Sequence, residues 1–205
     1  MACETCVGQY NHPGDDGAQT WNDFEYFADV DEKMCLFEFN GGGPVWELFF
    51  AALDAGWHLS PTYNQDNHGA DWGSKNDRRS ALLLPELDSA SLRAAMLERR
   101  SFVSMDKNAS LTLMADGDCW MGSILSGYSS LTIDVEARDA DSSDGFISLS
   151  IYGPAGALLE THDCGGAQEC SAQLTIPVSS PTYAVARAEQ TDGDYLVSAP
   201  IWVEP

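Results

Sequence analysis

Four side chains of the kinds that ligate metal ions stand just after apolar segments of the sequence. His12 lies in "YNHPGDD", Glu38 in "FEFNGGG", and Asp66 and His68 in "NQDNHGADWGS". Imidazole and carboxylate groups can share one divalent cation, and that cation turns bound water into a nucleophile near neutral pH. Asp66 or Glu38 would then accept the proton. The spacing of Asp66 and His68 is equally that of a polar surface turn, because Asn, Asp and Gly favour turns.

The elements around these residues decide between the two interpretations. Strands are expected at residues 6–11, 34–40, 57–64, 80–86 and 101–105, with helices at 20–30, 44–56 and 89–100. Such alternation is typical of parallel β/α units. Because parallel strands end at one edge of a sheet, the first three would bring His12, Glu38 and the Asp66–His68 pair together. Three strand ends that each carry a possible metal ligand favour a metal site.

The sequence changes character near residue 107. Beyond it, short β-rich runs are separated by turn residues such as "DSSDG" and "TDGD", and several runs alternate apolar and polar residues, as at Leu131, Ile133 and Val135. This pattern predicts an antiparallel β-sandwich over residues 108–205. The expected fold is therefore α/β plus all-β, with a partial β/α barrel over residues 1–107.

Charge limits the classes of partner. The 205 residues include 32 acidic and 10 basic ones, for a formal net charge of −22. Nucleic acids and anionic membranes need basic patches, so neither is expected as a partner. The sequence has no apolar run long enough to span a bilayer, and its N-terminus lacks the pattern of a signal peptide. As given, the chain is expected to be cytoplasmic.

The spacing of the six cysteines suggests two further features, one of which favours an oxidising compartment over the cytoplasm. Cys3 and Cys6 form a C-x-x-C pair, which is typical of zinc or redox chemistry. Cys164 and Cys170 enclose "GGAQE", and this spacing predicts a disulfide loop of the kind found in secreted or periplasmic proteins.

The same motifs resemble a known family. "YNHPGDD", "FEFNGGG", "NQDNHGADWGS" and "LERRSFVSMD" are similar to the last barrel segments of PHP-type (polymerase and histidinol phosphatase) metallohydrolases, in their CehA/McbA-like branch. "GDCWMGSIL", "IYGPAG" and "PIWV" resemble the β-rich appendage of that branch. The resemblance implies a zinc or manganese site with His12, Asp66 and His68 as ligands, and Glu38 in a supporting position. The family's opening H-x-H pair is missing, so the match covers only the second half of the barrel.

The resemblance implies that a metal-activated water hydrolyses a small-molecule ester. The ester would be a phosphodiester or a phosphotriester. Carboxyl-ester or carbamate hydrolysis and a non-catalytic, metal-binding remnant of a longer enzyme are the alternatives. His58 and Asn64 precede Asp66 and are candidate substrate contacts, and Lys75 or Arg78 could hold a phosphoryl oxygen. A barrel cut in half would leave an open sheet edge and apolar faces, so a homodimer or larger oligomer is expected.

Overall fold

A small parallel sheet forms near the N-terminus of the computed structural model, which describes residues 6–14, 21–39, 44–141, 143–178 and 182–205. Its strands pair in the order β1 (Gly8–Tyr10), β2 (Met34–Glu38) and β3 (Ser60–Thr62). Helix α3 (Val45–Asp54) packs on this sheet, with the Phe49 ring 5.3 Å from Phe37 and 5.1 Å from Phe39. The parallel arrangement expected for these three segments is thus present, but it stops there.

The expected truncated β/α barrel is wrong. Strands β4 (Arg79–Leu82) and β5 (Ser101–Ser104) pair antiparallel with each other instead of continuing the parallel series. Helix α4 (Ser89–Leu97) lies between them in the sequence, and Ala95 is its one buried residue. Because β4 and β5 run antiparallel, this helix is not the crossover of a parallel β/α unit. β5 also pairs antiparallel with β14 (Tyr195–Ser198), so both strands join the C-terminal sheets and the fold is mostly β.

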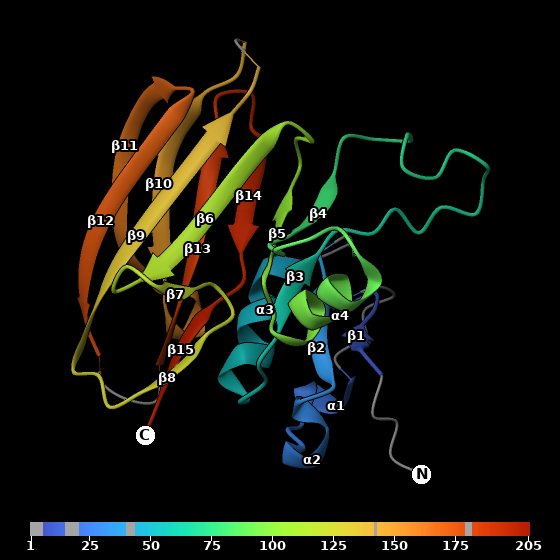
Figure 1. The fold of residues 1–205 in the computed structure, drawn as a ribbon, viewed down its shortest axis with the longest axis vertical. Helices are drawn as coiled ribbons and strands as arrows, with labels where there is room; N and C mark the ends of the chain where they lie inside the picture. The colour runs from blue at the N-terminus through green and yellow to red at the C-terminus, as the bar shows by residue number, and fades with distance from the viewer. Residues whose placement is uncertain (1–5, 15–20, 40–43, 142, 179–181) are drawn as a thin grey trace.

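Two sheets make up the sandwich seen at the left of Figure 1. One has the order β12-β9-β6-β7 and the other β11-β10-β13-β14-β5-β4, with β15 pairing to β13 and β8 pairing to β15. The remaining strands are β6 (Ala109–Ala115), β7 (Cys119–Trp120), β8 (Ile124–Ser126), β9 (Ser130–Asp139), β10 (Phe146–Tyr152), β11 (Leu158–Ala167), β12 (Glu169–Pro177), β13 (Thr182–Gln190) and β15 (Ile201–Glu204), with one 3-10 turn at Pro154–Gly156. The expected alternation holds on β9, where Leu131, Ile133 and Val135 are buried.

The larger sheet contributes side chains to two hydrophobic cores, one on each of its faces. On β13, Ala184 and Ala186 pack into the core between the two sandwich sheets, whereas Tyr183 and Val185 pack with α3 and the parallel sheet. Alternate residues of a strand point to opposite faces, so a single sheet can lie between both layers. Strands β4 and β5 precede the boundary expected at residue 107 and yet belong to this sheet. The division into domains at that residue stays a prediction.

The helix expected over residues 20–30 is two short elements instead. Residues Trp21–Phe24 all have positive φ, between 49° and 60°, which makes a single left-handed turn. Helix α2 (Ala28–Asp31) follows after Phe27, an extended residue. Thr20, the expected N-cap, lies outside the described residues. The segment is apolar enough for a helix, but burial of Phe24 in an aromatic cluster with Tyr10 and Trp57 decides its path.

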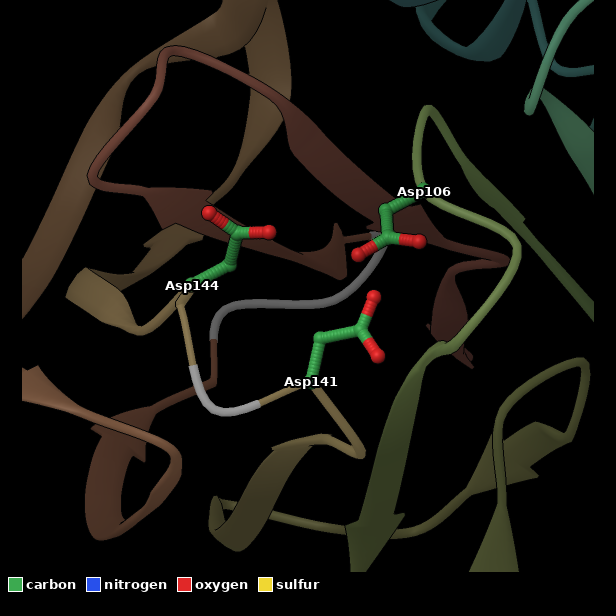
Figure 2. Close-up of side chains that lie close together, drawn as sticks. All are labelled: Asp106, Asp141 and Asp144. Atoms are coloured by element: carbon green, nitrogen blue, oxygen red, sulfur yellow. The ribbon is translucent and has the colours of Figure 1, made fainter.

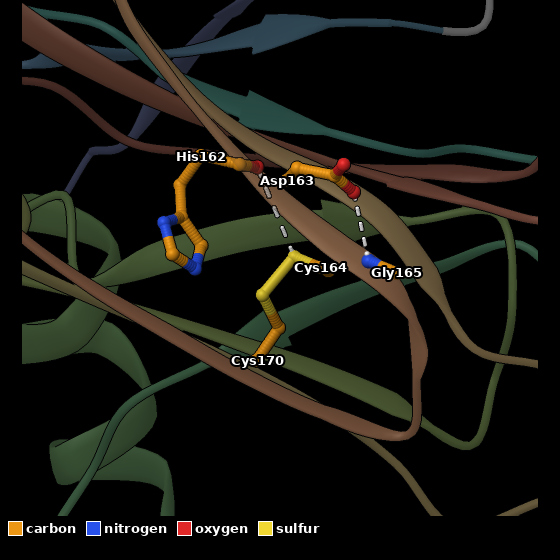
Figure 3. The surroundings of a disulfide bond; sticks show 5 residues. All are labelled: His162, Asp163, Cys164, Gly165 and Cys170. Carbon is orange, nitrogen blue, oxygen red and sulfur yellow. Dashed lines mark hydrogen bonds between the residues drawn. A yellow bond between two sulfur atoms is a disulfide. The ribbon is translucent and has the colours of Figure 1, made fainter.

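A disulfide joins Cys164 and Cys170, the pair expected to be bridged (Figure 3). Cys164 lies on β11 at the edge of the larger sheet, and Cys170 lies on β12 in the other sheet. The bond therefore ties the two sheets together at their shared edge. Cys6 is also disulfide-bonded, while Cys35 and Cys119 are free thiols.

None of the helices in the described part of the chain has the length and apolarity that crossing a bilayer requires.

Candidate functional site

His12 and Glu38 lie together at the carboxyl edge of the parallel sheet. Glu38 ends β2 and is 2% exposed, and His12 follows β1 with φ of 53°. The backbone N–H of His12 donates to Glu38 Oε2 at 2.6 Å, and the ring Nδ1 lies 3.5 Å from the same oxygen. The sequence correctly predicts that these two strand ends meet.

Asp66 and His68 lie on the long loop between β3 and β4, which extends away from both sheets at the right of Figure 1. Their side chains are 56% and 89% exposed, and His68 Nε2 is 3.3 Å from Asp66 Oδ1. Within the described ranges, no third ligand-type side chain of His, Cys, Asp or Glu joins either this pair or His12 and Glu38. His12, Asp66 and His68, the residues expected to share one ion, therefore do not make a three-ligand site as placed, and Glu38, expected in a supporting position, lies beside His12.

His58, a candidate substrate contact, is enclosed in the protein. It is 6% exposed, with Nδ1 2.6 Å from Asp31 Oδ2 and Nε2 3.1 Å from Glu204 Oε1. Burial alone would raise the pKa of Asp31, but hydrogen bonds from His58 and the charges of His58 and Arg99 outweigh it and hold that pKa below its usual value. This arrangement ties the last strand to α2.

The other expected substrate contacts lie along the loop. Asn64 and Arg78 line a cavity of about 400 Å³ together with Asp66 and Trp72. The Arg78 guanidinium lies over the Tyr63 ring, 5.5 Å from its centre, while Lys75 is exposed.

A cluster of three aspartates at one end of the sandwich did not emerge from the sequence. Figure 2 shows Asp106, from the turn after β5, facing Asp141 and Asp144 from the turn between β9 and β10. One carboxylate oxygen from each lies within 4.8 Å of the others. Asp106 and Asp144 are half-buried, and Asp141 is exposed.

Two further acids lie beside this cluster. Burial raises the pKa of Asp139, and the negative charge of Asp106 raises it further despite a hydrogen bond from the backbone N–H of Asp141. Burial likewise raises the pKa of Asp194, and the charges of Asp192, Asp106 and Asp144 add to it. The cluster therefore holds more negative charge than the neighbouring side chains neutralise.

Gln190, at the end of β13, reaches into the same cluster and is fully buried. Its Nε2 lies 2.5 Å from Asp139 Oδ2 and 3.5 Å from Asp106 Oδ2. Its carbonyl Oε1 is buried and has no hydrogen-bond partner within the described part of the chain. A buried oxygen without a donor is costly, because it loses its water and gains nothing in return.

The donors of this cluster are all oxygens. Carboxylate and amide oxygens suit hard cations such as Ca²⁺ and disfavour zinc, which prefers nitrogen and sulfur ligands. The sequence signal was present in "DADSSDG" and "DKN", which read only as turn residues. What the sequence did not show is that these two turns meet.

No family model and no curated protein matches the chain. Among solved structures, the fibronectin(III)-like modules of Clostridium thermocellum CbhA are similar over 45% of this chain and 94% of theirs, at 16% identity and a TM-score of 0.30. An engineered protein is 16% identical at a TM-score of 0.30 over 98% of this chain, and a Cellulomonas fimi endo-beta-1,4-mannanase double mutant is 15% identical at 0.23 over 96%. The chain spans 47% and 46% of the length of these last two. Similarities at this level of identity and TM-score carry no argument about function.

Proposed function

We propose that this protein is a non-catalytic β-sandwich module of an exported protein, stabilised by a calcium ion. One observation carries the proposal: carboxylate oxygens of Asp106, Asp141 and Asp144 lie within 4.8 Å of one another although they come from two different turns. An ion held by all three would join the β5–β6 turn to the β9–β10 turn, and thereby the two sandwich sheets to which β5 and β9 belong.

The surroundings of the cluster support an ion there. Burial raises the pKa values of Asp139 and Asp194, and the negative charges of Asp106 and Asp144 raise both further, so a cation beside them would relieve part of this unfavourable charge. The unpartnered Oε1 of Gln190 supplies a further oxygen of the kind that Ca²⁺ binds. Because rotation about the last side-chain bond exchanges the two ends of an amide, a bound cation would draw this oxygen toward Asp106.

An exported location fits both the bridge and the ion. The disulfide between Cys164 and Cys170, and the one at Cys6, are typical of oxidising compartments. Extracellular modules bind Ca²⁺ with dissociation constants of about 0.1 to 1 mM, well above cytosolic calcium levels. Both features point away from the cytoplasmic location expected from the N-terminal sequence.

Calcium titration of the calcium-free protein tests the proposal, with isothermal calorimetry for binding and thermal unfolding for stability. At a hundredfold excess over the dissociation constant, one site adds about 2.7 kcal/mol to the free energy of unfolding. For a chain of this size, that raises Tm by roughly 5 to 10 °C. Asp141→Asn and Asp144→Asn should each weaken binding by at least about tenfold, because each removes a charged ligand.

Asp29→Asn is the matched control, since it removes one exposed carboxylate on α2, a different part of the fold. It should leave the calcium response unchanged. The proposal fails if calcium changes neither heat nor Tm, or if Asp144→Asn responds as the wild-type protein does.

A divalent-metal hydrolase remains the second candidate, favoured by the approach of His12 to Glu38 at the sheet edge. If it holds, His12→Ala and Glu38→Gln each reduce bound zinc or manganese by at least about tenfold. His162→Ala, on exposed β11, should change nothing. Hydrolysis of a phosphotriester and of a carbamate, before and after chelation, measures the activity. Equal rates with and without metal would eliminate this candidate.

A further inference from the structure

The loop between β3 and β4 presents an exposed tryptophan beside an open cavity that both aromatic and polar side chains line. Trp72 leaves 73% of its surface exposed, and the cavity of about 400 Å³ next to it falls in the usual range for small-ligand sites. We propose that this loop binds a neutral carbohydrate. The Trp72 ring would stack on one face of a sugar, and Asn64 and Asp66 would bind its hydroxyl groups. This site is independent of the calcium cluster.

The Trp72 ring is held in place although it is exposed. Its indole Nε1 donates to the backbone carbonyl of Asn67 at 2.8 Å. The Asn67 carbonyl is itself positioned, because the Asn67 side chain donates to Asp71 Oδ1 at 2.6 Å and accepts from the Gly69 N–H at 2.8 Å. A ring fixed before the ligand arrives loses little conformational entropy on binding.

Side-chain hydrogen bonds also brace the rest of the loop, which has no regular secondary structure. Gln65 Oε1 accepts from the Gly73 N–H at 2.9 Å, and Gln65 Nε2 donates to Asn76 Oδ1 at 3.2 Å. The Arg79 guanidinium donates to the carbonyls of Asn76 and Gly73 at 2.8 and 3.1 Å. These bonds cross the loop from one side to the other and hold the cavity open.

Two polar side chains of the lining keep hydrogen-bonding capacity for a ligand. Asn64 makes no side-chain hydrogen bond in the described part of the chain, and the one contact there of the Asp66 carboxylate is His68 at 3.3 Å. Asn64 therefore offers donors and an acceptor, and Asp66 offers acceptors. The other polar side chains of the loop named above are used to build the loop itself.

This combination selects a sugar. The C–H groups on one face of a pyranose ring are weakly positive and match the negative face of an indole, while its hydroxyls match an amide and a carboxylate. An acidic ligand is disfavoured at long range by the formal net charge of −22, and the Asp66 carboxylate on the lining opposes the local charge of Arg78. Tyr63 and Trp72 supply apolar surface on the lining, but Asn64, Gln65, Asp66 and Arg78 interrupt it with polar groups that a lipid or a plain aromatic ring would leave unpaired. A neutral carbohydrate is the ligand that meets all three conditions.

Native electrophoresis in gels that contain dextran, mannan, galactan or mixed-linkage glucan tests the proposal. At least one polymer should retard the wild-type protein, and Trp72→Ala should weaken the retardation by at least about tenfold, as loss of a central aromatic contact does. Asn64→Ala and Asp66→Ala should weaken it as well. Since Trp72 and Asp66 are exposed, circular dichroism should show the fold of these variants unchanged.

Trp120→Ala is the matched control, because Trp120 is 41% exposed on β7, outside the loop. This variant should be retarded like the wild-type protein. Asp144→Asn should also be retarded like the wild-type protein, and that result would show that the loop binds sugar independently of the calcium cluster. If Trp72→Ala is retarded as strongly as the wild type, or if none of the four polymers retards the wild type, the inference is wrong.

Discussion

Asp31 accepts two hydrogen bonds from His58, one from the ring Nδ1 at 2.6 Å and one from the backbone N–H at 3.0 Å. The Arg99 guanidinium donates to the backbone of both residues. Its Nε is 2.5 Å from the carbonyl oxygen of His58, and a terminal nitrogen is 3.3 Å from the carbonyl oxygen of Asp31. His58 reaches Glu204 on the last strand through Nε2. These contacts join α2, the segment just before β3, the segment just after α4 and β15 at one largely buried point.

Removal of the Asp31 charge should destabilise the protein. Asp31→Asn removes the negative charge that accepts hydrogen bonds from His58 and faces Arg99, and hydrogen bonds to a charged group contribute about 1.5 to 3 kcal/mol. Because the pKa of Asp31 is lowered in the folded protein, its contribution is present in full above the unfolded value near 3.8 and is lost as pH falls through the lower pKa of the folded protein. Urea unfolding should show a larger difference between wild type and variant at pH 7 than at pH 3. A difference of equal size at both values would contradict this account.

Calcium should stabilise the protein more at neutral than at acid pH. The pKa values of Asp139 and Asp194 are raised in the folded protein, so the stability that their protonation contributes is present below pH 3.8 and is lost as pH rises through the raised values. A cation replaces those protons and reverses the loss. The difference in Tm with and without calcium isolates this effect, because Asp31 contributes equally to both measurements. We expect a larger gain at pH 7 than at pH 4, and an equal gain would argue against an ion in this cluster.

The disulfide between Cys164 and Cys170 should contribute measurably to stability. Replacement of both cysteines by serine should lower the free energy of unfolding by about 2 to 4 kcal/mol, since the bond restricts the unfolded chain. Cys119→Ser is the control, because Cys119 is a free thiol. Urea unfolding of the three proteins measures the difference. If the double variant loses no more free energy of unfolding than Cys119→Ser does, the disulfide does not stabilise the protein.

We also expect a homodimer, formed through the first part of the chain. Strand β1 lies at one edge of the parallel sheet, and nearby Trp21, Phe27 and Val30 are 49%, 50% and 42% exposed. An open strand edge beside exposed apolar side chains favours pairing with a second copy. Light scattering at micromolar concentration measures the mass. A value near the 22.2 kDa of one chain would contradict the prediction.

The sequence by itself determined most of the segments that form strands and helices, though not the path of residues 20–30, and it determined how several of them face the interior. The alternation of Leu131, Ile133 and Val135 predicted their burial, the Gly-containing spacing of Cys164 and Cys170 predicted their bridge, and two strand ends correctly placed His12 beside Glu38. These features depend on neighbours in the sequence or on the period of the strand, which the residues themselves express.

Only the tertiary structure decided how those segments pair and which side chains meet. β4 and β5 were expected to continue the parallel series, but they pair antiparallel with each other, and β5 pairs antiparallel with β14 in the sandwich. Asp106 and Asp144 are 38 positions apart and meet because the turns that carry them lie at the same end of the sandwich. Pairing direction and such contacts follow from the burial of apolar faces contributed by distant segments, and no local pattern specifies which distant face that will be.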